Sequence, residues 1–376
     1  MTRKPLEGVR VVELARILAG PWAGQVLADL GAEVVKVEAP AGDDTRGWGP
    51  PFVTRADGTR EAAYFHSTNR GKRSITADLT VAEDRERVVS LVREADVLIE
   101  NFKVGGLAKY GLDHESLKAV NERLIYCSIT GFGQTGPYKQ RAGYDFMIQG
   151  MAGIMDLTGD PEGEPQKMGV AFADIFTGLY SVIGIQAALI ERQRTGRGCH
   201  IDMALFDCMS GVLANQAMNY LVSGIAPRRL GNAHPNIVPY QVFAVTDGHL
   251  IIAVGNNRQF QALTDILGLP GVAADSRFAD NPARVENREA LIAILEPMIA
   301  GRARDRLLME LEERHVPAGP INTVADVLAD PQIVARRMRI DVEDQDGTAI
   351  PGLRLPILFD GEPAVAATPS PRLDRK

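Results

Sequence analysis

The first 130 residues alternate short apolar strands with helical segments, and this alternation restricts the possible folds more than any other feature. The stretches 9–14, 33–38, 97–100 and 124–128 are rich in valine, isoleucine and leucine, as buried strands are. Helices are predicted between them at 21–30, 81–94 and near 115–120. Strands that alternate with helices form parallel sheets. The sequence therefore predicts an α/β protein with a Rossmann-like, doubly wound parallel sheet.

The pattern changes after residue 145 to longer apolar helices, predicted at 175–192 and 204–222, with a short strand at 199–202 between them. A polar stretch with prolines, 226–239, is typical of a linker. We therefore predict a large α/β domain at 1–225, completed by 325–376, and a smaller α+β domain at 226–324. The smaller domain is expected to contain a hairpin, with strands at 240–246 and 249–255, and helices at 259–267 and 287–314. The proline-rich C-terminal tail is expected to be mobile.

Composition and charge exclude several classes of protein. The net charge is -7 and neither half has a basic run, so no nucleic-acid partner is expected. The three cysteines are far apart in the sequence, which argues against a disulfide framework and a zinc site, and we expect no metal. No run approaches 18 uninterrupted apolar residues, and the first residues leave no room for a signal peptide. We expect no membrane association and a cytoplasmic location.

The segment 131–136 matches the G-x-G-x-x-G pattern of dinucleotide-binding loops and follows a predicted strand. In that motif the last glycine opens a helix whose amides face a pyrophosphate. Here Pro137 and Tyr138 follow, with no amphipathic run behind them. The segment is better interpreted as a glycine-rich loop that lets a ligand approach the backbone.

Asp174 stands at the start of the apolar helix predicted at 175–192. Unpaired amides and the positive end of the helix dipole favour an anion there. One interpretation is an ordinary N-cap aspartate, which contributes about 1 kcal/mol to stability. The other is a carboxylate nucleophile that the same field keeps ionised in apolar surroundings.

Basic residues cluster at 69–73, and single charges recur at Arg46 and Lys109. They form either a solvated surface or a seat for the phosphates of a nucleotide-like ligand. His234 falls in the predicted linker, where ligand sites often form, although a structural histidine fits equally well. The other histidines are scattered and no serine lies in a G-x-S-x-G elbow, so a serine or cysteine hydrolase has little support.

Several separate motifs, in this order, closely resemble the class III CoA-transferases. They are 18–21, 29–38, 69–74, 100–102, 131–137 and 173–174. The resemblance is collinear from about residue 5 to about residue 360. It is closest to the branch that acts on dicarboxylates such as succinate, glutarate and hydroxymethylglutarate, through 42–46, 127–137, 140–145, 237–243 and 255–260.

The resemblance implies a two-domain subunit in an interlocked homodimer, with acyl-CoA as a substrate and no permanently bound cofactor. Asp174 matches the catalytic nucleophile of the family, and the reaction would pass from a donor such as succinyl-CoA through an aspartyl-CoA thioester. The positions that match CoA contacts are Leu18, Ala19, Ala77, Asn101, Phe102, Lys103, Lys109, Ala142, Gly143, Tyr144 and Asp145. Gly255, Asn256 and Asn257 match a loop that covers the acyl group in relatives, and His234 is the further candidate for substrate contact.

Two departures from the family pattern matter. A basic residue that some relatives carry after the second strand is Ala39 here, so Arg46 or Arg73 is expected to contact a CoA phosphate instead; relatives also usually continue beyond the position of Lys376. A racemase branch of the family uses a histidine at the position of Tyr144. A tyrosine with a pKa of about 10 is a poor base at neutral pH. The alternatives that remain are a 2-methylacyl-CoA racemase, a CoA hydrolase and a noncatalytic CoA-binding protein.

Overall fold

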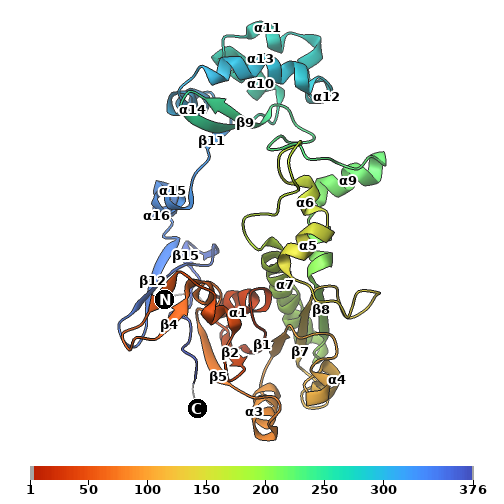
Figure 1. Cartoon of the computed structure of the whole chain (residues 1–376), viewed down its shortest axis with the longest axis vertical. Coiled ribbons are helices and arrows are strands. Elements are labelled where there is room, and N and C mark those ends of the chain that lie inside the picture. The colour runs from red at the N-terminus through yellow and green to blue at the C-terminus, as the bar shows by residue number, and fades with distance from the viewer. Residues whose placement is uncertain (1–3, 375–376) are drawn as a thin grey trace. The chain divides into compact units, whose positions relative to one another are not determined.

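The computed structural model describes residues 4–374, which fold into two compact units (Figure 1). The first unit contains the described parts of Met1–Ile154, Lys167–Ser223 and Pro331–Lys376. The second contains Met155–Gln166 and Gly224–Asp330. The chain thus leaves the first unit twice and completes it with its C-terminal segment. The sequence predicts that 155–166, 224–225 and 325–330 belong to the larger domain, whereas all three stretches belong to the second unit.

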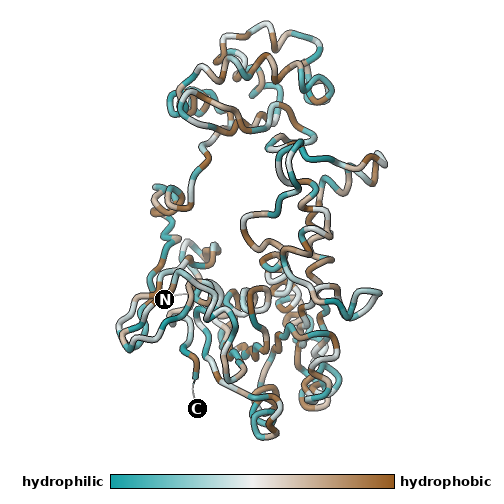
Figure 2. Tube along the Cα trace, in the orientation of Figure 1, coloured by the Kyte–Doolittle hydropathy of each residue, from teal (hydrophilic) through white to brown (hydrophobic). Residues whose placement is uncertain are grey.

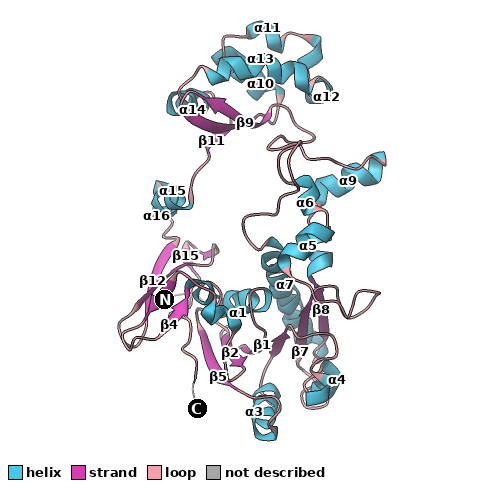
Figure 3. Cartoon of the chain, viewed as in Figure 1, coloured by secondary structure: helices cyan, strands magenta, loops and turns pink. Residues whose placement is uncertain are grey.

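A six-stranded sheet forms the centre of the first unit (Figure 3). Every pair of neighbouring strands is parallel, which confirms the predicted parallel sheet. The order of the strands is β5 (Lys72–Thr76), β2 (Glu33–Glu38), β1 (Arg10–Leu14), β6 (Val97–Glu100), β7 (Ile125–Thr130) and β8 (His200–Ala204).

Successive residues of these strands point to opposite faces of the sheet, and each face has its own apolar core. Val11 and Ile99 belong to one core, which also contains residues of α1 (Ala19–Asp29) and α7 (Phe172–Thr195). Their neighbours Val12 and Leu98 belong to a second core, with residues of α3 (Ala82–Arg93) and α4 (His114–Lys118). Helices therefore cover both faces, as in a doubly wound fold.

The helix α7 is longer than predicted, and it begins at Phe172 and ends at Thr195, where Gly196 adopts a left-handed conformation with φ of 73°. By length and composition alone α7 could cross a membrane. Its buried residues, among them Ile185 and Leu189, nevertheless lie in the core beside the sheet. We interpret α7 as the central core helix of the first unit.

The helix predicted at 204–222 is in fact interrupted. Ala204 is the last residue of β8, and α8 (Leu205–Gly211) is separated from α9 (Ala214–Ser223) by two residues. Ala214 has φ of 45°, a conformation that a continuous helix does not contain. The remaining helices and strands of this part of the chain are β3 (Phe52–Thr54), β4 (Arg60–Ala62), α2 (Ala63–His66), α5 (Asp145–Met151) and α6 (Ile154–Leu157).

The second unit combines an antiparallel sheet with helices. The predicted hairpin is confirmed, because β9 (Tyr240–Val245) pairs antiparallel with β10 (Gly248–Ala253), which also pairs with β11 (Ala318–Pro320). The helix predicted at 287–314 is two helices, which separate at 301–303. The helices are α10 (Asn257–Ile266), α11 (Pro270–Ala273), α12 (Asn281–Glu286), α13 (Arg288–Ala300), α14 (Arg304–Glu313) and α15 (Val324–Ala329). Figure 2 shows brown and teal segments alternating along these helices, as expected where one face is buried.

The C-terminal segment returns to the first unit through α16 (Pro331–Ala335), β12 (Arg339–Glu343) and β13 (Ala349–Leu353), followed by β14 (Leu358–Phe359) and β15 (Glu362–Pro363). The expectation of a mobile tail is wrong for the described residues. Gly71 N donates to Thr368 O at 3.0 Å, and Arg55 donates to Ser370 O at 3.2 Å. The tail is therefore anchored to the first unit by hydrogen bonds.

Candidate active site

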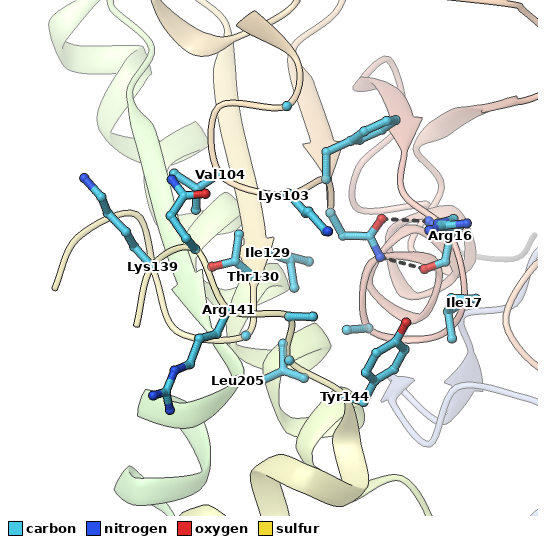
Figure 4. Close-up of a pocket in the computed structure, with 18 of the residues that line it drawn as sticks. Arg16, Ile17, Lys103, Val104, Ile129, Thr130, Lys139, Arg141, Tyr144 and Leu205 are labelled. Atoms are coloured by element: carbon cyan, nitrogen blue, oxygen red, sulfur yellow. Dashed lines mark hydrogen bonds between the residues drawn. The ribbon is translucent and has the colours of Figure 1, made fainter. Parts of the chain in front are cut away.

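The first unit contains a pocket of about 620 Å³ at the carboxyl ends of β1, β6 and β7 (Figure 4). We call it the main pocket. Ligands of open α/β sheets bind at this edge, because the loops that follow neighbouring strands meet there. Its walls are formed by 16–19, 101–106, 109–110, 129–131 and 139–145, together with Asp174 and Leu205.

The main pocket brings together most of the residues proposed from the sequence. They are Leu18, Ala19, Asn101, Phe102, Lys103, Lys109, Ala142, Gly143, Tyr144, Asp145 and Asp174. Ala77 lies instead in a smaller hollow of about 210 Å³, which we call the side hollow. Phe102 and Tyr110 contribute to both cavities. The two cavities are therefore neighbours that share one wall.

Arg46 does not have the role predicted for it. Its guanidinium donates to both oxygens of Glu38, at 2.9 and 2.7 Å, and also pairs with Glu61. Its Cζ lies 3.7 Å from the centroid of the Phe65 ring, and its side chain is 9% exposed. An arginine with its donors engaged by buried carboxylates cannot also bind a phosphate. The assignment of Arg46 to a CoA phosphate is therefore wrong.

The basic cluster at 69–73 is not a phosphate seat in this structure. Arg70 pairs with Asp29 at 2.6 Å, and the fully buried Lys72 pairs with Glu13 at 2.8 Å. Arg73 is exposed on the edge strand β5, and it lines neither the main pocket nor the side hollow. The solvated-surface interpretation fits Arg73 alone, because Arg70 and Lys72 hold the core of the first unit together.

Basic side chains that the sequence interpretation missed line the main pocket beside Lys103 and Lys109. They are Arg16, Lys139 and Arg141 (Figure 4). Arg141 lies over the ring of Tyr138, with its Cζ 3.9 Å from the ring centroid. Their positions in the sequence could have identified them. Arg141 directly precedes the matched residues 142–145, Lys139 lies two residues before Arg141, and Arg16 lies two residues before Leu18. Arg16 pairs with Asp44 at 2.8 Å, so the other four basic residues supply the positive charge of the cavity. Four cations at one cavity of a protein with net charge -7 make a local site for an anion.

Two of the pocket loops are tied together by a pair of reciprocal hydrogen bonds. Arg16 N donates to Asn101 Oδ1 at 3.0 Å, and Asn101 Nδ2 donates to Arg16 O at 2.7 Å. Figure 4 shows both as dashed lines at Arg16. The loop after β1 is also held at Ile17, which has φ of 73° and whose N donates to Asp43 Oδ2 at 3.2 Å. These contacts fix the chain as it enters α1. The N-cap of α1, Leu18, and its first residue, Ala19, both line the pocket, and no side chain caps this end of the helix.

The loop that carries the G-x-G-x-x-G pattern has a packing role at Gly131. A Cβ atom added to Gly131 would lie 2.5 Å from the Cα of Gly143, and one added to Gly143 would lie 2.2 Å from the Cα of Gly131. No side chain fits at either position without a shift of the backbone. The two glycines therefore bring the loop after β7 against the segment that leads into α5, and together they shape one wall of the main pocket.

Asp174 is not the N-cap of α7, so the ordinary capping interpretation is wrong. The N-cap residue is Ala171, which offers no side-chain acceptor. Asp145 on α5 supplies the acceptor instead. Its Oδ1 accepts from Ala173 N at 2.8 Å and from Asp174 N at 3.4 Å. Its other oxygen accepts from the buried Gln149 amide at 2.7 Å. A carboxylate from a neighbouring helix thus performs the capping.

The Asp174 carboxyl has an unusual electrostatic environment. Burial raises its pKa to about 7, and the negative charge of Asp145 adds to the rise. Among the described residues, no hydrogen-bond donor contacts the Asp174 carboxyl. The sequence interpretation expected the helix dipole to keep this group ionised. Burial and the Asp145 charge instead raise its pKa, and Asp145, not Asp174, accepts from the first amides of α7.

Tyr64 on α2 was not identified from the sequence, yet it lies within the field of Asp174. Burial raises the pKa of Tyr64 to about 12, with further contributions from Asp174 and Asp145. The rings of Tyr64 and Trp48 pack edge to face, with their centroids 5.4 Å apart. No motif in the sequence pointed to Tyr64, because it is brought near Asp174 only by the fold.

The residues proposed to contact substrate, His234 and 255–257, lie in the second unit. Asn256 Oδ1 accepts from Gln259 N at 3.0 Å and caps α10, while Gly255 N donates to Gln259 Oε1 at 2.8 Å. His234 Nδ1 accepts from Asn236 N at 3.0 Å. These contacts give the loop a defined shape, and its contact with substrate stays a prediction.

Comparisons with known proteins agree with this site. Residues 6–376 match the model of CoA-transferase family III. The chain is 59% identical over 373 residues to a succinate–glutarate CoA-transferase of Agrobacterium fabrum, which covers 99% of this chain and 93% of the relative. It is 43% identical over 341 residues to the human succinyl-CoA:glutarate CoA-transferase, covering 90% of this chain and 77% of the relative. A crystal structure of a CaiB/BaiF family protein from Brucella suis is 66% identical, with a TM-score of 0.88 and coverage of 100% and 97%.

The match to the family model covers the parallel sheet and every residue of the main pocket, Asp174 included. The chain belongs to the class III CoA-transferases, and it is a CoA-transferase.

Proposed function

We propose that this enzyme moves CoA from succinyl-CoA to glutarate or a closely similar dicarboxylate, with Asp174 as the covalent nucleophile. The observation that carries the proposal is the placement of Asp174 at the main pocket, where its carboxyl faces no hydrogen-bond donor among the described residues. The names of the relatives from Agrobacterium fabrum and human support the choice of donor and acceptor.

The reaction would proceed in four balanced steps. A carboxylate oxygen of Asp174 attacks the thioester carbonyl of succinyl-CoA, the C–S bond breaks, and an anhydride and CoA thiolate form. The thiolate attacks the Asp174 carbonyl and releases succinate, which leaves an aspartyl-CoA thioester. The acceptor carboxylate then attacks this thioester and displaces the thiolate. The thiolate finally attacks the acceptor acyl group of the second anhydride and restores the Asp174 carboxylate.

The residues of the chain would contribute mainly by positioning and by electrostatics. Asp145 fixes the first turn of α7, and with it the position of Asp174. Because Asp145 and burial raise the pKa of Asp174, the ionised carboxylate is a stronger nucleophile than an ordinary aspartate. An anhydride reacts with water, so a partly enclosed pocket also protects the intermediate.

CoA would bind along the main pocket and the side hollow. The start of α1 and four basic residues, Lys103, Lys109, Lys139 and Arg141, favour the phosphate groups, and the pantetheine arm would extend toward Asp174. The side hollow at Ala77 and Phe102 offers an apolar surface of the size that an adenine ring needs. His234 and 255–257 of the second unit are proposed to contact the acyl group.

A homodimer is part of the same proposal. Large apolar side chains are exposed on α7 and α9 of the first unit, among them Ile183 (59%), Ile190 (69%), Leu221 (72%) and Val222 (81%). Exposed apolar residues at this density are typical of surfaces that a partner covers. Sedimentation of the purified protein tests this directly, and a monomer at micromolar concentration would contradict it.

The function is tested by incubating the enzyme with succinyl-CoA and separating the CoA thioesters by chromatography. We expect glutaryl-CoA to form only when glutarate is present, and we expect none from Asp174→Ala. Free thiol in the absence of an acceptor would indicate a hydrolase. Exchange of the α-proton of 2-methylacyl-CoA without an acceptor would indicate a racemase, and CoA binding without any turnover would indicate a noncatalytic protein.

A further inference from the structure

Glu100 is a buried carboxyl group that the proposed reaction does not use. It is the last residue of β6, is 5% exposed, and does not line the main pocket. Its Oε2 accepts from Phe102 N at 2.8 Å. The hydrogen bonds that act on its charge come from Phe102 and the Ser128 hydroxyl, and none comes from a cation among residues 4–374. A buried carboxyl without a counter-ion is costly, which calls for a reason for its presence.

The hydrogen bond from Phe102 N closes the turn that follows β6, and this turn forms part of the pocket wall. Asn101 makes the two reciprocal bonds to Arg16, Phe102 lines both cavities, and Lys103 is one of the pocket cations. Glu100 therefore holds, through one backbone amide, a turn whose three residues each reach the cavity. A shift of this turn would also displace the loop at Arg16, because Asn101 is hydrogen-bonded to it.

A chain of polar groups connects Glu100 to the surface. Ser128 on β7 is the register partner of Glu100 on β6, and its hydroxyl lowers the pKa of the Glu100 carboxyl. Ser128 Oγ also lies 3.0 Å from His200 Nε2. His200 is exposed, and its ring stacks on that of His114 with centroids 4.7 Å apart. When the shared proton is on His200, Nε2–H donates to Ser128 Oγ and the Ser128 hydroxyl donates to the Glu100 carboxylate. When it is on Glu100, both hydrogen bonds reverse, and one proton has moved.

Several charged or titratable groups face this chain of polar groups. Burial raises the pKa of Tyr126 and that of Cys127, both on β7, and the charge of Glu100 adds to each rise. Its partner on β1 is Leu14, which does not titrate. Burial and His114 lower the pKa of His200, while Asp202 and Glu115 raise it. Burial raises the pKa of Glu100 to about 7, so its charge changes near neutral pH.

We propose that Glu100 is a positioning residue for CoA binding. It exchanges a proton with solvent through Ser128 and His200, and its ionisation state determines how firmly the turn at 101–103 is held. A carboxylate accepts an amide hydrogen bond more strongly than a neutral carboxylic acid does. The ionised form thus fixes the turn, and the protonated form loosens it. The inference rests on the assignment of the main pocket to CoA in the proposed function.

The test is calorimetric titration with free CoA between pH 6 and pH 8, which needs no turnover. The variants are Glu100→Gln, Ser128→Ala and, as a matched control, Glu86→Gln, which neutralises an exposed glutamate on α3. The phosphomonoester of CoA itself titrates with a pKa of about 6, but it does so equally for every variant. The difference between variants therefore reports the pH dependence that comes from the protein and not from the CoA phosphate.

We expect Glu100→Gln to bind CoA about five- to tenfold more weakly than the wild type at pH 8 and equally well at pH 6. Ser128→Ala should move the midpoint of the wild-type change to higher pH, because the Ser128 hydrogen bond lowers the pKa of Glu100. Glu86→Gln should match the wild type throughout.

Two results would overturn the inference. One is a Glu100→Gln protein with wild-type affinity at every pH, and the other is an affinity that is weaker by one constant factor, which indicates a structural role without a charge effect. If the wild-type protein binds no CoA, the pocket assignment fails and the inference fails with it. If CoA binds but no acid accepts it, the proposed function fails. The inference is then still decided by the CoA affinities of Glu100→Gln and Ser128→Ala.

Discussion

Asp145 and Asp174 face each other across the start of α7, where one oxygen of Asp145 accepts the backbone amide of Asp174 at 3.4 Å and that of Ala173 at 2.8 Å. A single carboxylate therefore caps the helix and places a negative charge beside the proposed nucleophile. The same contact positions Asp174 and raises its pKa. Stability and reactivity at this site are consequently linked, and each can be measured.

Replacing Asp174 by Asn should stabilise the folded protein at alkaline pH. The pKa of Asp174 is about 7 in the folded protein, above its ordinary value of 3.8, so the folded state holds this proton more tightly than the unfolded chain does. The cost of burying the charge is absent below pH 3.8, grows between the two values, and is complete above pH 7 or so. We expect Asp174→Asn to raise the free energy of unfolding at pH 8 by roughly 2–4 kcal/mol and to leave it unchanged near pH 4.

A matched control for this change is Asp207→Asn. Asp207 occupies the same position on α8 that Asp174 occupies on α7, the third residue of a helix whose N-cap is an alanine, but it is exposed. Denaturant unfolding at several pH values measures both variants. A stabilisation of Asp174→Asn that is independent of pH, or one that Asp207→Asn shares, would show that burial of the Asp174 charge is not its cause.

Asp145→Asn should move the acid side of the activity profile to lower pH. Asp174 must be ionised to attack, so kcat/KM is expected to rise with an apparent pKa of about 7 in the wild type. Asparagine keeps an oxygen to cap α7 but removes the charge that adds to the rise in the pKa of Asp174. Burial remains, so the profile should not return fully to the ordinary aspartate value. A profile that keeps its wild-type midpoint would show that Asp145 does not act on Asp174.

Gly131→Ala should disturb the pocket wall. The new methyl group would meet the Cα of Gly143 at 2.5 Å, so the backbone of one loop must move. We expect a loss of stability of about 1–3 kcal/mol, as for overpacked cores, and a higher KM for succinyl-CoA. The control is Gly211→Ala on α8, where a Cβ meets no atom within 4 Å. Equal effects of the two substitutions would contradict the role assigned to the contact between Gly131 and Gly143.

Lys139→Met should weaken the binding of succinyl-CoA without changing the chemistry. Lys139 lies at the main pocket, and the proposal places CoA phosphates near it. Because a remote phosphate contact is the same in the ground state and the transition state, KM should rise by about three- to tenfold while kcat stays constant. The difference from the wild type should shrink at about 0.5 M salt. Lys118→Met, at an exposed lysine on α4, is the control. A fall in kcat with unchanged KM would place Lys139 nearer the reacting atoms.

The sequence predicted the central sheet well because buried parallel strands are apolar runs that contrast with the helices around them. The bounds of β2 and β6 were predicted to the residue, as 33–38 and 97–100. The breaks at 212–213 and 301–303 were missed, because no proline stands at either break. Gly301 ends α13, but a single glycine is also tolerated inside a helix. The anchored tail was missed because its hydrogen bonds join residues that are far apart in the sequence, as Arg55 and Ser370 are.

The candidate site was predicted where motifs carry it and missed where the fold assembles it. Asp174 and the 142–145 segment lie in recognisable stretches, and both line the main pocket. Tyr64 reaches the field of Asp174 only through the fold. Arg46 was misassigned because a sequence shows a charge but not its partners, and Glu38 and Glu61 engage that charge.

The most direct test of Asp174 as the nucleophile is mass spectrometry of the enzyme after incubation with succinyl-CoA and reduction by borohydride. We predict that the side chain of Asp174 is converted to an alcohol, that no other residue changes, and that an added acceptor acid diminishes the modification. An unmodified Asp174, together with CoA transfer that persists in Asp174→Ala, would contradict a covalent role for this residue.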